Sequence, residues 1–290
     1  MKAKVFFKRL GLFSLLVVST GAAWYFNRPQ PNNSVERLFQ GVVYRRIAIK
    51  EPRPVVLHFI EIDLDGASPR FKVTRGHSER ELPYDAHSVS EFLEEAGVQL
   101  AINGSFFTPW WSNGILDYYP HTGDPLKTKG ISASEGKVFC QPDPNYPALY
   151  ITKEGSPSFE PQQPVYNAIA GKAMFVKNGR FALEGSRDRF CTQPEPRTAI
   201  GLTKDRERMI IMVVDGRQPR YSEGLTLQEL AQYAMDLGAH EALAFDGGGS
   251  TALVMEDDTG SPKQLNCPID KRIPGRERPV ANHLGIYLER

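Results

Sequence analysis

The sequence predicts an α+β fold with mixed or antiparallel twisted sheets and few helices, in a single domain that follows an N-terminal anchor. Three observations lead to this prediction. Short apolar, β-branched runs recur along the chain, only two helices have clear capping signals, and an uncharged apolar segment stands near the N-terminus. The resulting boundaries are a leader at residues 1–27, a linker and lead-in segment at 28–50, and the folded domain at 51–290.

The leader is typical of a signal peptide or a single membrane anchor. Lys2, Lys4, Lys8 and Arg9 precede an uncharged stretch at residues 10–27. The small residues of "GAA" suit a cleavage site, whereas the "WYF" that follows suits an aromatic belt at the membrane interface, so both alternatives stay open. In either case we expect an extracytoplasmic domain that contacts the membrane only through this segment.

Composition argues against nucleic acid as a partner. The formal net charge is +1, but without the four basic residues of the leader 31 basic residues stand against 34 acidic ones. No basic run remains in the domain to neutralise phosphates.

The three cysteines, Cys140, Cys191 and Cys267, show no C-x-x-C spacing, and the histidines show no ligand spacing, so we predict no metal and no cofactor. Which cysteines pair stays open.

The first half of the domain predicts a strand pair, a helix and a buried strand. Residues 55–64 alternate and are rich in β-branched side chains, and "DGASPR" turns the chain into a return strand. The segment "SVSEFLEEAG" begins with a capping box and ends at a glycine, which predicts a short helix. Residues 98–102 then form a short strand that delivers Asn103 and Gly104 at its end.

The second half repeats this unit. A hairpin over residues 197–203 and 209–214 ends at Asp215, and "TLQELAQYAMDLG" is a second capped amphipathic helix that ends at a glycine. The strand "ALAF" then delivers Asp246. Strands that end in polar turns can gather those turns at one edge of a sheet, where ligand sites form. Residues 106–164 predict a long irregular region that is functional or mobile.

The turn in "LAFDGGGSTALV" admits several interpretations. A P-loop requires a lysine after the glycines and a helix behind them, and a Rossmann turn requires its own glycine spacing and a helix, so we discard both. A serine hydrolase with Ser250, Asp270 and His283 has the chain order of α/β-hydrolases, but "TALVME" is strand-like where a helix is needed. An anion-binding nest of glycine amides fits better, since a simple reversal of direction requires one glycine rather than three.

Aromatic residues cluster in the irregular region and suit stacking on sugar rings, although a hydrophobic flap under a long loop is about equally consistent with them. They are Phe106, Phe107, Trp110, Trp111, Tyr118 and Tyr119. The two strand-end aspartates, Asp215 and Asp246, have a similar ambiguity, because most such residues only make turns. Brought together, they could divide acid and base roles at an anomeric carbon.

Six motifs occur in an order that resembles the phosphodiester glycosidase family. They are "NGSFF", "RTAIG", "DGRQ", "EGLTLQELAQYAMDLGA", "DGGGST" and "RPVANHLGIY". The resemblance extends from about residue 55 to the C-terminus, with Ser105 at a position where the family commonly has a second glycine. It implies hydrolysis of a sugar-1-phosphodiester at the bond between the sugar and the oxygen, with a carbohydrate phosphodiester as substrate.

This resemblance implies specific roles at the site. Asp246 would be the catalytic base or nucleophile, and Asp215 the second carboxylate or a binder of sugar hydroxyls. The groups expected to hold phosphate charge are Arg197, the amides of Gly247, Gly248 and Gly249, and the hydroxyls of Ser250 and Thr251. Asn103, Gly104 and Asn282 are expected at the sugar. A protein that binds sugar phosphates without turnover is the alternative, although a pure phosphate binder gains nothing from nearby carboxylates.

Overall fold

The computed structural model describes residues 28–114 and 116–288. The predicted leader at residues 1–27 lies outside the described residues. Within the described part of the chain, no helix combines the length and the apolar character that a membrane crossing requires.

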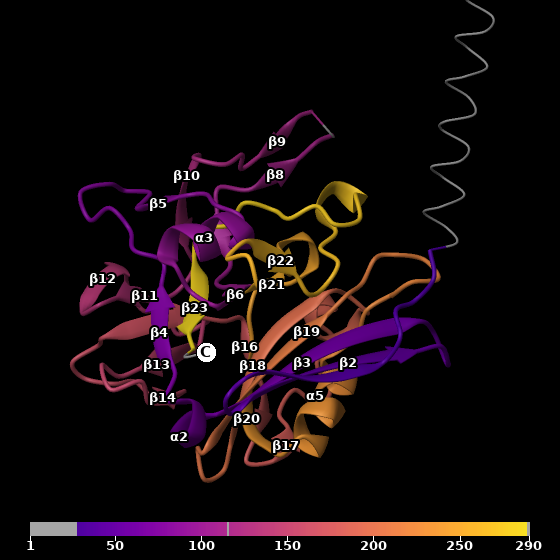
Figure 1. Ribbon diagram of the computed structural model, residues 1–290. Helices are drawn as coiled ribbons and strands as arrows, with labels where there is room; N and C mark the ends of the chain where they lie inside the picture. The colour runs from indigo at the N-terminus through magenta and orange to yellow at the C-terminus, as the bar shows by residue number, and fades with distance from the viewer. Residues whose placement is uncertain (1–27, 115, 289–290) are drawn as a thin grey trace, which may run out of the picture.

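An eight-stranded antiparallel sheet is the largest layer of the fold (Figure 1). Its strand order is β1-β2-β3-β19-β18-β20-β16-β17. The strands are β1 (Ser34–Phe39), β2 (Val42–Ile49), β3 (Val55–Asp63), β16 (Ala173–Lys177), β17 (Arg180–Phe181), β18 (Arg197–Thr203), β19 (Arg208–Val214) and β20 (Ala239–Ala244). The predicted strand at residues 55–64 and the predicted hairpin at 197–214 are confirmed as β3 and as the β18–β19 pair.

The segment 28–50 differs from the linker and lead-in segment that its composition predicts. It contributes β1 and β2, and β2 pairs with β3 along its whole length, from Val42 opposite Ile62 to Ile49 opposite Val55. Burial alternates over the first half of β2, where Val42 and Tyr44 are buried and Val43 and Arg45 are not, as in a strand with one buried face. The Pro- and Asn-rich start of the segment conceals this pattern, because it resembles a linker.

Four smaller sheets and a few helices complete the fold. A five-stranded sheet has the order β22-β21-β6-β23-β4, and a second has the order β12-β11-β15-β13-β14. Their strands are β4 (Arg70–Val73), β6 (Leu100–Asn103), β21 (Leu253–Glu256), β22 (Pro262–Gln264) and β23 (His283–Tyr287), and β11 (Ser132–Ser134), β12 (Lys137–Cys140), β13 (Ala148–Ile151), β14 (Pro157–Ser158) and β15 (Asn167–Ala170). The remaining strands are β5 (Tyr84–Asp85), β7 (Phe107–Thr108), β8 (Trp111–Ser112), β9 (Tyr118–Tyr119) and β10 (Pro125–Thr128). Every ladder between described strands is antiparallel, and the region 106–164, predicted as irregular, contains the short strands β7 to β14.

Both helices with capping signals are present. They are α3 (Val89–Ala96), capped by Ser88 and Glu91, and α5 (Leu227–Asp236), capped by Thr226 and Glu229. Two single-turn helices, α2 (Leu64–Ala67) and α4 (Arg189–Thr192), are capped by Asp63 and Asp188 without a capping box, and two 3-10 turns, η1 (Gly248–Ser250) and η2 (Asp270–Arg272), have no side-chain cap. All three cysteines are unpaired. Few helices and mainly antiparallel sheets therefore define the fold class.

The large sheet is buried on both faces, which explains why its central strands are continuously apolar. Ile200 and Leu202 of β18 face a core shared with the two five-stranded sheets, whereas Ala199, which precedes them, belongs to the core beneath α5. Figure 1 shows α5 on one side of this sheet and the strands β4, β6 and β23 on the other. The ends of its central strands therefore lie at the boundary between two layers of the fold.

The two polar turns predicted to converge do so at such a boundary. They come from strands of different sheets, since β6 ends at Asn103 in the five-stranded sheet and β20 precedes Asp246 in the eight-stranded sheet. Asp246 N–H donates to the Gly104 carbonyl (3.0 Å), and Gly104 N–H donates to the Asn282 carbonyl (3.0 Å). The meeting point is thus a junction of two sheets rather than one sheet edge.

Candidate active site

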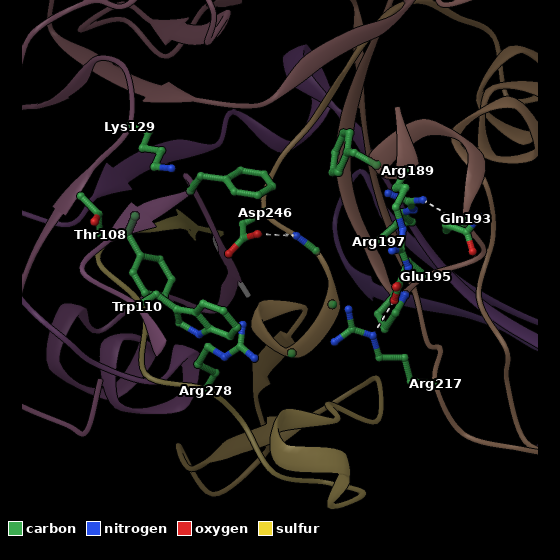
Figure 2. A pocket seen from close by; sticks show the side chains of 17 residues that line it. Thr108, Trp110, Lys129, Arg189, Gln193, Glu195, Arg197, Arg217, Asp246 and Arg278 are labelled. Atoms are coloured by element: carbon green, nitrogen blue, oxygen red, sulfur yellow. Dashed lines mark hydrogen bonds and ion pairs between the residues drawn. The ribbon is translucent and has the colours of Figure 1, made fainter. Parts of the chain in front are cut away.

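A cavity of about 460 Å³ opens at this junction. Its size is in the usual range for a small-molecule site. Figure 2 shows Asp246 in the middle of the cavity, with Trp110 and Arg278 on one side and Arg217 on the other. Five cationic side chains and two carboxylates line it, namely Lys129, Arg189, Arg197, Arg217 and Arg278, with Glu195 and Asp246. Positive charge therefore dominates the cavity, as an anionic ligand requires.

Asp246 is half-buried at the end of β20, and its carboxylate is held in place by its own turn. The Ser250 hydroxyl donates to Oδ2 (2.6 Å), and the Gly247 amide donates to Oδ1 (3.0 Å). Burial raises the pKa of Asp246 above its ordinary value, and the Ser250 hydroxyl, the Arg278 charge and the Gly247 amide offset part of that rise. A carboxylate with a raised pKa is a stronger base than an exposed one.

The three glycines make room for neighbouring groups. A Cβ on Gly247 would lie 2.6 Å from the Pro196 carbonyl oxygen, and one on Gly249 would lie 2.3 Å from Arg278 Nη2. Gly248 has a φ of +61°, and a Cβ there would lie 2.9 Å from Arg217 Nη2. Side chains at Gly248 and Gly249 would displace the two guanidinium groups, and one at Gly247 would clash with the Pro196 backbone. This close approach answers why one turn contains three glycines.

Two of the three glycine amides of this turn are less available to an anion than a glycine nest requires. The Gly247 amide donates to Asp246, and the Gly248 amide donates to the Pro196 carbonyl (3.0 Å). These bonds fix the shape of the turn. The guanidinium groups of Arg217 and Arg278, packed against the glycines, are the more accessible positive groups.

Arg278 and Arg217 are each oriented by a carboxylate. Arg278 Nε donates to the buried Asp270 (2.8 Å), Nη1 donates to the Ser250 hydroxyl (3.3 Å), and the guanidinium lies 5.3 Å from the centre of the Trp110 ring. Arg217 Nε pairs with Glu195 (Figure 2). Because one edge of each guanidinium is engaged in this way, its position beside the glycine turn is defined before any ligand arrives.

Arg197 lines the cavity from β18, as part of a buried hydrogen-bond network. Its Nε donates to the Leu225 carbonyl (2.9 Å), its Nη2 donates to the Gln193 carbonyl (2.6 Å), and its guanidinium lies over the Phe190 ring. Burial lowers the pKa of Arg197 to about 10, so the side chain remains a cation at neutral pH. It adds a fixed positive charge to the cavity wall.

The structure places Asp215 outside the residues that line the cavity. Its carboxylate is buried, accepts from Cys267 N–H (2.8 Å) and Asn266 Nδ2 (3.1 Å) on one oxygen, and contacts His58 Nε2 (3.1 Å) and the Tyr221 hydroxyl (3.3 Å) on the other. These bonds tie the end of β19 to the chain that leads into η2. The second carboxylate on the cavity wall is Glu195.

Asn103 and Asn282 are also buried in contacts within the protein. Asn103 Nδ2 donates to the Asp246 carbonyl (2.8 Å), and its Oδ1 accepts from Ala252 N–H (3.2 Å), so one side chain holds both ends of the glycine turn. Asn282 Oδ1 accepts from Ser105 N–H (2.8 Å). A Cβ on Gly104 would lie 2.6 Å from Asn282 Oδ1, which explains the glycine between them. These three residues position the turns at the junction.

Ser250 and Thr251 have different surroundings. Ser250 bridges Asp246 and Arg278, whereas the Thr251 hydroxyl is buried without a hydrogen-bond partner among the described residues. The serine-hydrolase alternative requires Ser250, Asp270 and His283 to form a chain of contacts. Instead Asp270 binds arginines, and the His283 ring contacts the Thr74 hydroxyl and the His87 carbonyl, so the geometry does not support a triad.

The aromatic residues of the irregular region separate into two groups. Phe106, Phe107 and Trp110 line the cavity, and Trp110 is about half exposed, with 49% of its surface accessible. Trp111 stacks on Tyr119 at 4.5 Å between ring centres, away from the lining residues. Stacking on a sugar ring is therefore open to the first group only.

Two arginines at the site, Arg217 and Arg278, are not among the site residues expected from the sequence. Both stand inside motifs that carry the family resemblance, "DGRQ" and "RPVANHLGIY". Those motifs supply a signal, but an arginine in a loop has no periodicity that identifies its partner. Only the contacts with Gly248 and Gly249 show why each arginine stands where it does.

Comparison with known proteins agrees with this geometry. A family model described as phosphodiester glycosidase matches residues 96–287, and the chain belongs to that family of hydrolases. The mouse enzyme N-acetylglucosamine-1-phosphodiester alpha-N-acetylglucosaminidase is 26% identical over 195 residues, which cover 62% of this chain and 36% of the mouse protein. The chain thus corresponds to about a third of that relative.

Solved structures share the fold at low sequence identity. The catalytic domain of the zebrafish N-acetylglucosamine-1-phosphodiester alpha-N-acetylglucosaminidase, auto-inhibited by its pro-peptide, has a TM-score of 0.61 at 19% identity, covering 91% of this chain and 86% of that one. A hypothetical protein from Synechocystis has a TM-score of 0.61 at 14% identity, covering 89% and 64%. A putative exported protein from Burkholderia pseudomallei has a TM-score of 0.56 at 15% identity, covering 81% and 74%.

Gly249→Ala tests the role of the glycine turn. The new methyl group would displace the Arg278 guanidinium, and we expect kcat/KM on a sugar-1-phosphodiester to fall about 100-fold, as for other misplacements of about 1 Å at a site. Gly136→Ala is the control, because Gly136 lies outside the cavity lining and a Cβ there meets no atom within 4 Å, so its φ of +83° can lower stability but not activity. Steady-state kinetics and thermal unfolding of both variants are the measurements. Full activity of Gly249→Ala would show that the position of Arg278 does not matter.

Proposed function

We propose that this protein hydrolyses a sugar-1-phosphodiester at the anomeric C–O bond. The observation that supports this most strongly is a half-buried carboxylate, Asp246, between two guanidinium groups in one cavity. The carboxylate suits chemistry at a developing oxocarbenium centre, and the guanidinium groups suit a phosphate that gains charge as it leaves. Family membership supports the same reaction class.

In the proposed reaction, the oxygen of water forms a bond to the anomeric carbon, and the bond from that carbon to the bridging oxygen breaks. The bridging oxygen leaves with the phosphate, which becomes a monoester, and the sugar gains the hydroxyl group. Asp246 either accepts the proton of the attacking water or attacks first as a nucleophile. The anomeric form of the first product, followed by NMR, distinguishes these two routes.

The cationic side chains of the cavity have different roles in the proposed reaction. Arg278 and Arg217 bind the phosphate oxygens, because their guanidinium groups lie against the glycine turn next to Asp246. Arg197 raises the local positive potential on the side of the cavity where Arg217 lies (Figure 2). A phosphate monoester is a good leaving group, so this site does not require the strong general acid that an ordinary glycosidase uses. Trp110 provides an exposed aromatic surface for a sugar ring.

We further propose that the enzyme acts outside the cytoplasm, on phosphodiesters of the cell envelope or of extracellular glycans. The basic, then apolar, N-terminal sequence supports export, and one protein of the same fold is described as a putative exported protein. N-acetylglucosamine, which the name of the mouse relative contains, is the first sugar to test.

The deciding experiment is a product assay in ¹⁸O-labelled water with a panel of sugar-1-phosphodiesters. The proposed reaction puts the label in the free sugar and leaves the phosphate monoester unlabelled. Label in the phosphate would identify a phosphodiesterase that cleaves the P–O bond. Tight binding of every substrate without turnover would instead identify a sugar-phosphate-binding protein.

A further inference from the structure

A second cavity, of about 400 Å³, adjoins the candidate active site. Trp110, Arg217 and Arg278 line both cavities, so the two spaces meet along these three side chains. Lys271 and Arg272 of η2 line only the second cavity. A substrate bound at Asp246 that extends past Trp110 therefore enters a space with additional positive charge.

The charge of this second cavity is only partly balanced by carboxylates. Four of its lining side chains are cationic, and no acidic residue belongs to its described lining. Arg217 is paired with Glu195, and Arg278 is paired with Asp270. Among the described residues, Lys271 and Arg272 have no ion-pair partner, and Arg272 is exposed. Two positive charges are thus left for a ligand.

The backbone holds these two side chains at an energetic cost. Lys271 has a φ of 54° and Arg272 a φ of 60°, and both lie in the left-handed region that disfavours residues other than glycine. The turn is closed by Asp270 N–H, which donates to the Arg276 carbonyl (3.0 Å), and by Ile273 N–H, which donates to the Asp270 carbonyl (3.0 Å). Strained positions that carry unbalanced like charges are unfavourable for stability alone, which favours a binding role.

Neighbouring groups orient Lys271 and provide a surface for a sugar between the two cavities. Lys271 Nζ donates to the Ser112 hydroxyl (3.0 Å) and lies 4.2 Å from the centre of the Tyr118 ring. Trp110 stands where the cavities meet, with about half of its surface exposed. The order along the groove is therefore Asp246, an exposed aromatic ring, and then a pair of cations.

We propose that the second cavity binds a further anionic group on the aglycone of the substrate. This inference rests on the proposed hydrolysis and names its substrate class: a glycan in which phosphate recurs, with one phosphodiester at Asp246, the aglycone sugar on Trp110, and the next phosphate at Lys271 and Arg272. Guanidinium and ammonium groups bind phosphate oxygens through charge-assisted hydrogen bonds.

The test measures binding and turnover separately. Binding uses glucose-1,6-bisphosphate and glucose-6-phosphate as probes, by isothermal titration calorimetry, because the first places a hexose between two phosphates. We expect the bisphosphate to bind the wild-type protein at least about 10-fold more tightly, and this preference to weaken at high salt. The double variant Lys271→Gln/Arg272→Gln loses the preference. The matched control Lys153→Gln/Lys177→Gln removes two exposed charges elsewhere and keeps it.

Turnover uses two sugar-1-phosphodiesters that differ only in a second phosphate on the aglycone. The ratio of their kcat/KM values should favour the doubly charged substrate by about 10-fold in the wild type and approach one in Lys271→Gln/Arg272→Gln. An equal affinity of the wild type for both probes, or an unchanged preference in the double variant, would overturn the inference. A clear binding preference without hydrolysis of either substrate would support the second cavity and contradict the proposed reaction.

Discussion

Asp246→Asn is expected to lower kcat on an activated sugar-1-phosphodiester by about 100- to 10,000-fold, the range typical for loss of a general base. Asn has nearly the same shape and retains an oxygen that can accept from the Gly247 amide, but it neither takes a proton nor attacks carbon. The affinity for a sugar phosphate should change less, because the arginines remain in place. Rapid-mixing kinetics with the leaving group followed by absorbance measure the effect. Near-normal turnover would remove Asp246 from the mechanism.

The same substitution should make the protein more stable at neutral pH. The pKa of Asp246 is raised in the folded state, mainly by burial, so the ionised carboxylate opposes folding. This cost is absent below the ordinary pKa of 3.8 and is fully present once the pH exceeds the folded-state pKa. We therefore expect Asp246→Asn to raise Tm at pH 7 and to have a smaller effect near pH 3.5. A Tm lowered at pH 7 would contradict the unfavourable burial of this charge.

Asp215→Asn is the matched comparison, because Asp215 is the other strand-end aspartate. Its carboxylate accepts hydrogen bonds from Asn266 and Cys267 and contacts His58 in the protein interior. Asn cannot accept on both of its side-chain atoms, and a buried group that loses its hydrogen-bond partner costs about 1–3 kcal/mol, so this variant should be less stable than the wild type. The opposite signs of the two effects on Tm distinguish an aspartate kept for chemistry from one kept for structure.

Local patterns in the sequence account for much of the fold. The capping boxes of α3 and α5 are read from four residues each, and β3 is recognised by its run of apolar and β-branched residues. The strands β1 and β2 are harder to recognise, because a Pro- and Asn-rich start precedes them and their partner β3 supplies the burial. Local signals therefore identify elements, while the joining of distant strands into one sheet depends on contacts far apart in sequence.

The candidate site, like the fold, is predictable from the sequence only in part. Asp246 and its three glycines are predictable, because an aspartate at a strand end followed by a glycine run is unusual as a plain turn. The pairing of Arg278 with Gly249, or of Arg217 with Gly248, joins residues 29 and 31 positions apart through close packing alone. Likewise, Asp215 and Asp246 resemble one another in sequence, and only the cavity distinguishes them. Spatial contacts, rather than residue types, decide these roles.

Acid should destabilise this protein through one buried histidine. His283 of β23 stacks on Phe92, its Nε2 donates to the His87 carbonyl (3.0 Å), and its Nδ1 accepts from the Thr74 hydroxyl (2.9 Å). These contacts suit the neutral ring. Burial lowers the pKa of His283 from 6.5 to about 3, with a smaller contribution from the nearby His87 charge.

The sign of the effect follows from this lowered pKa. The folded state binds a proton at His283 less readily than the unfolded state, so the contribution to stability is fully present above pH 6.5 and is lost as the pH falls toward 3. Over that window the free energy of unfolding should fall by up to about 5 kcal/mol, a large part of the stability of a typical domain. Asp246 opposes this loss, because acid relieves its own burial cost.

The measurement is urea unfolding between pH 7.5 and pH 4 for His283→Gln and its parent, both in the Asp246→Asn background, which removes the opposing contribution. A Gln at 283 keeps a donor and an acceptor but does not titrate, so we expect it to be less stable at pH 7.5 and to lose less stability toward pH 4. Carboxylates with lowered pKa, such as that of Glu135, contribute equally to both proteins and cancel in the difference. Parallel pH profiles would show that another group carries the acid sensitivity. Converging profiles would assign it to His283, which lies next to Asn282 where the two sheets meet, so acid would loosen the junction that positions Asp246.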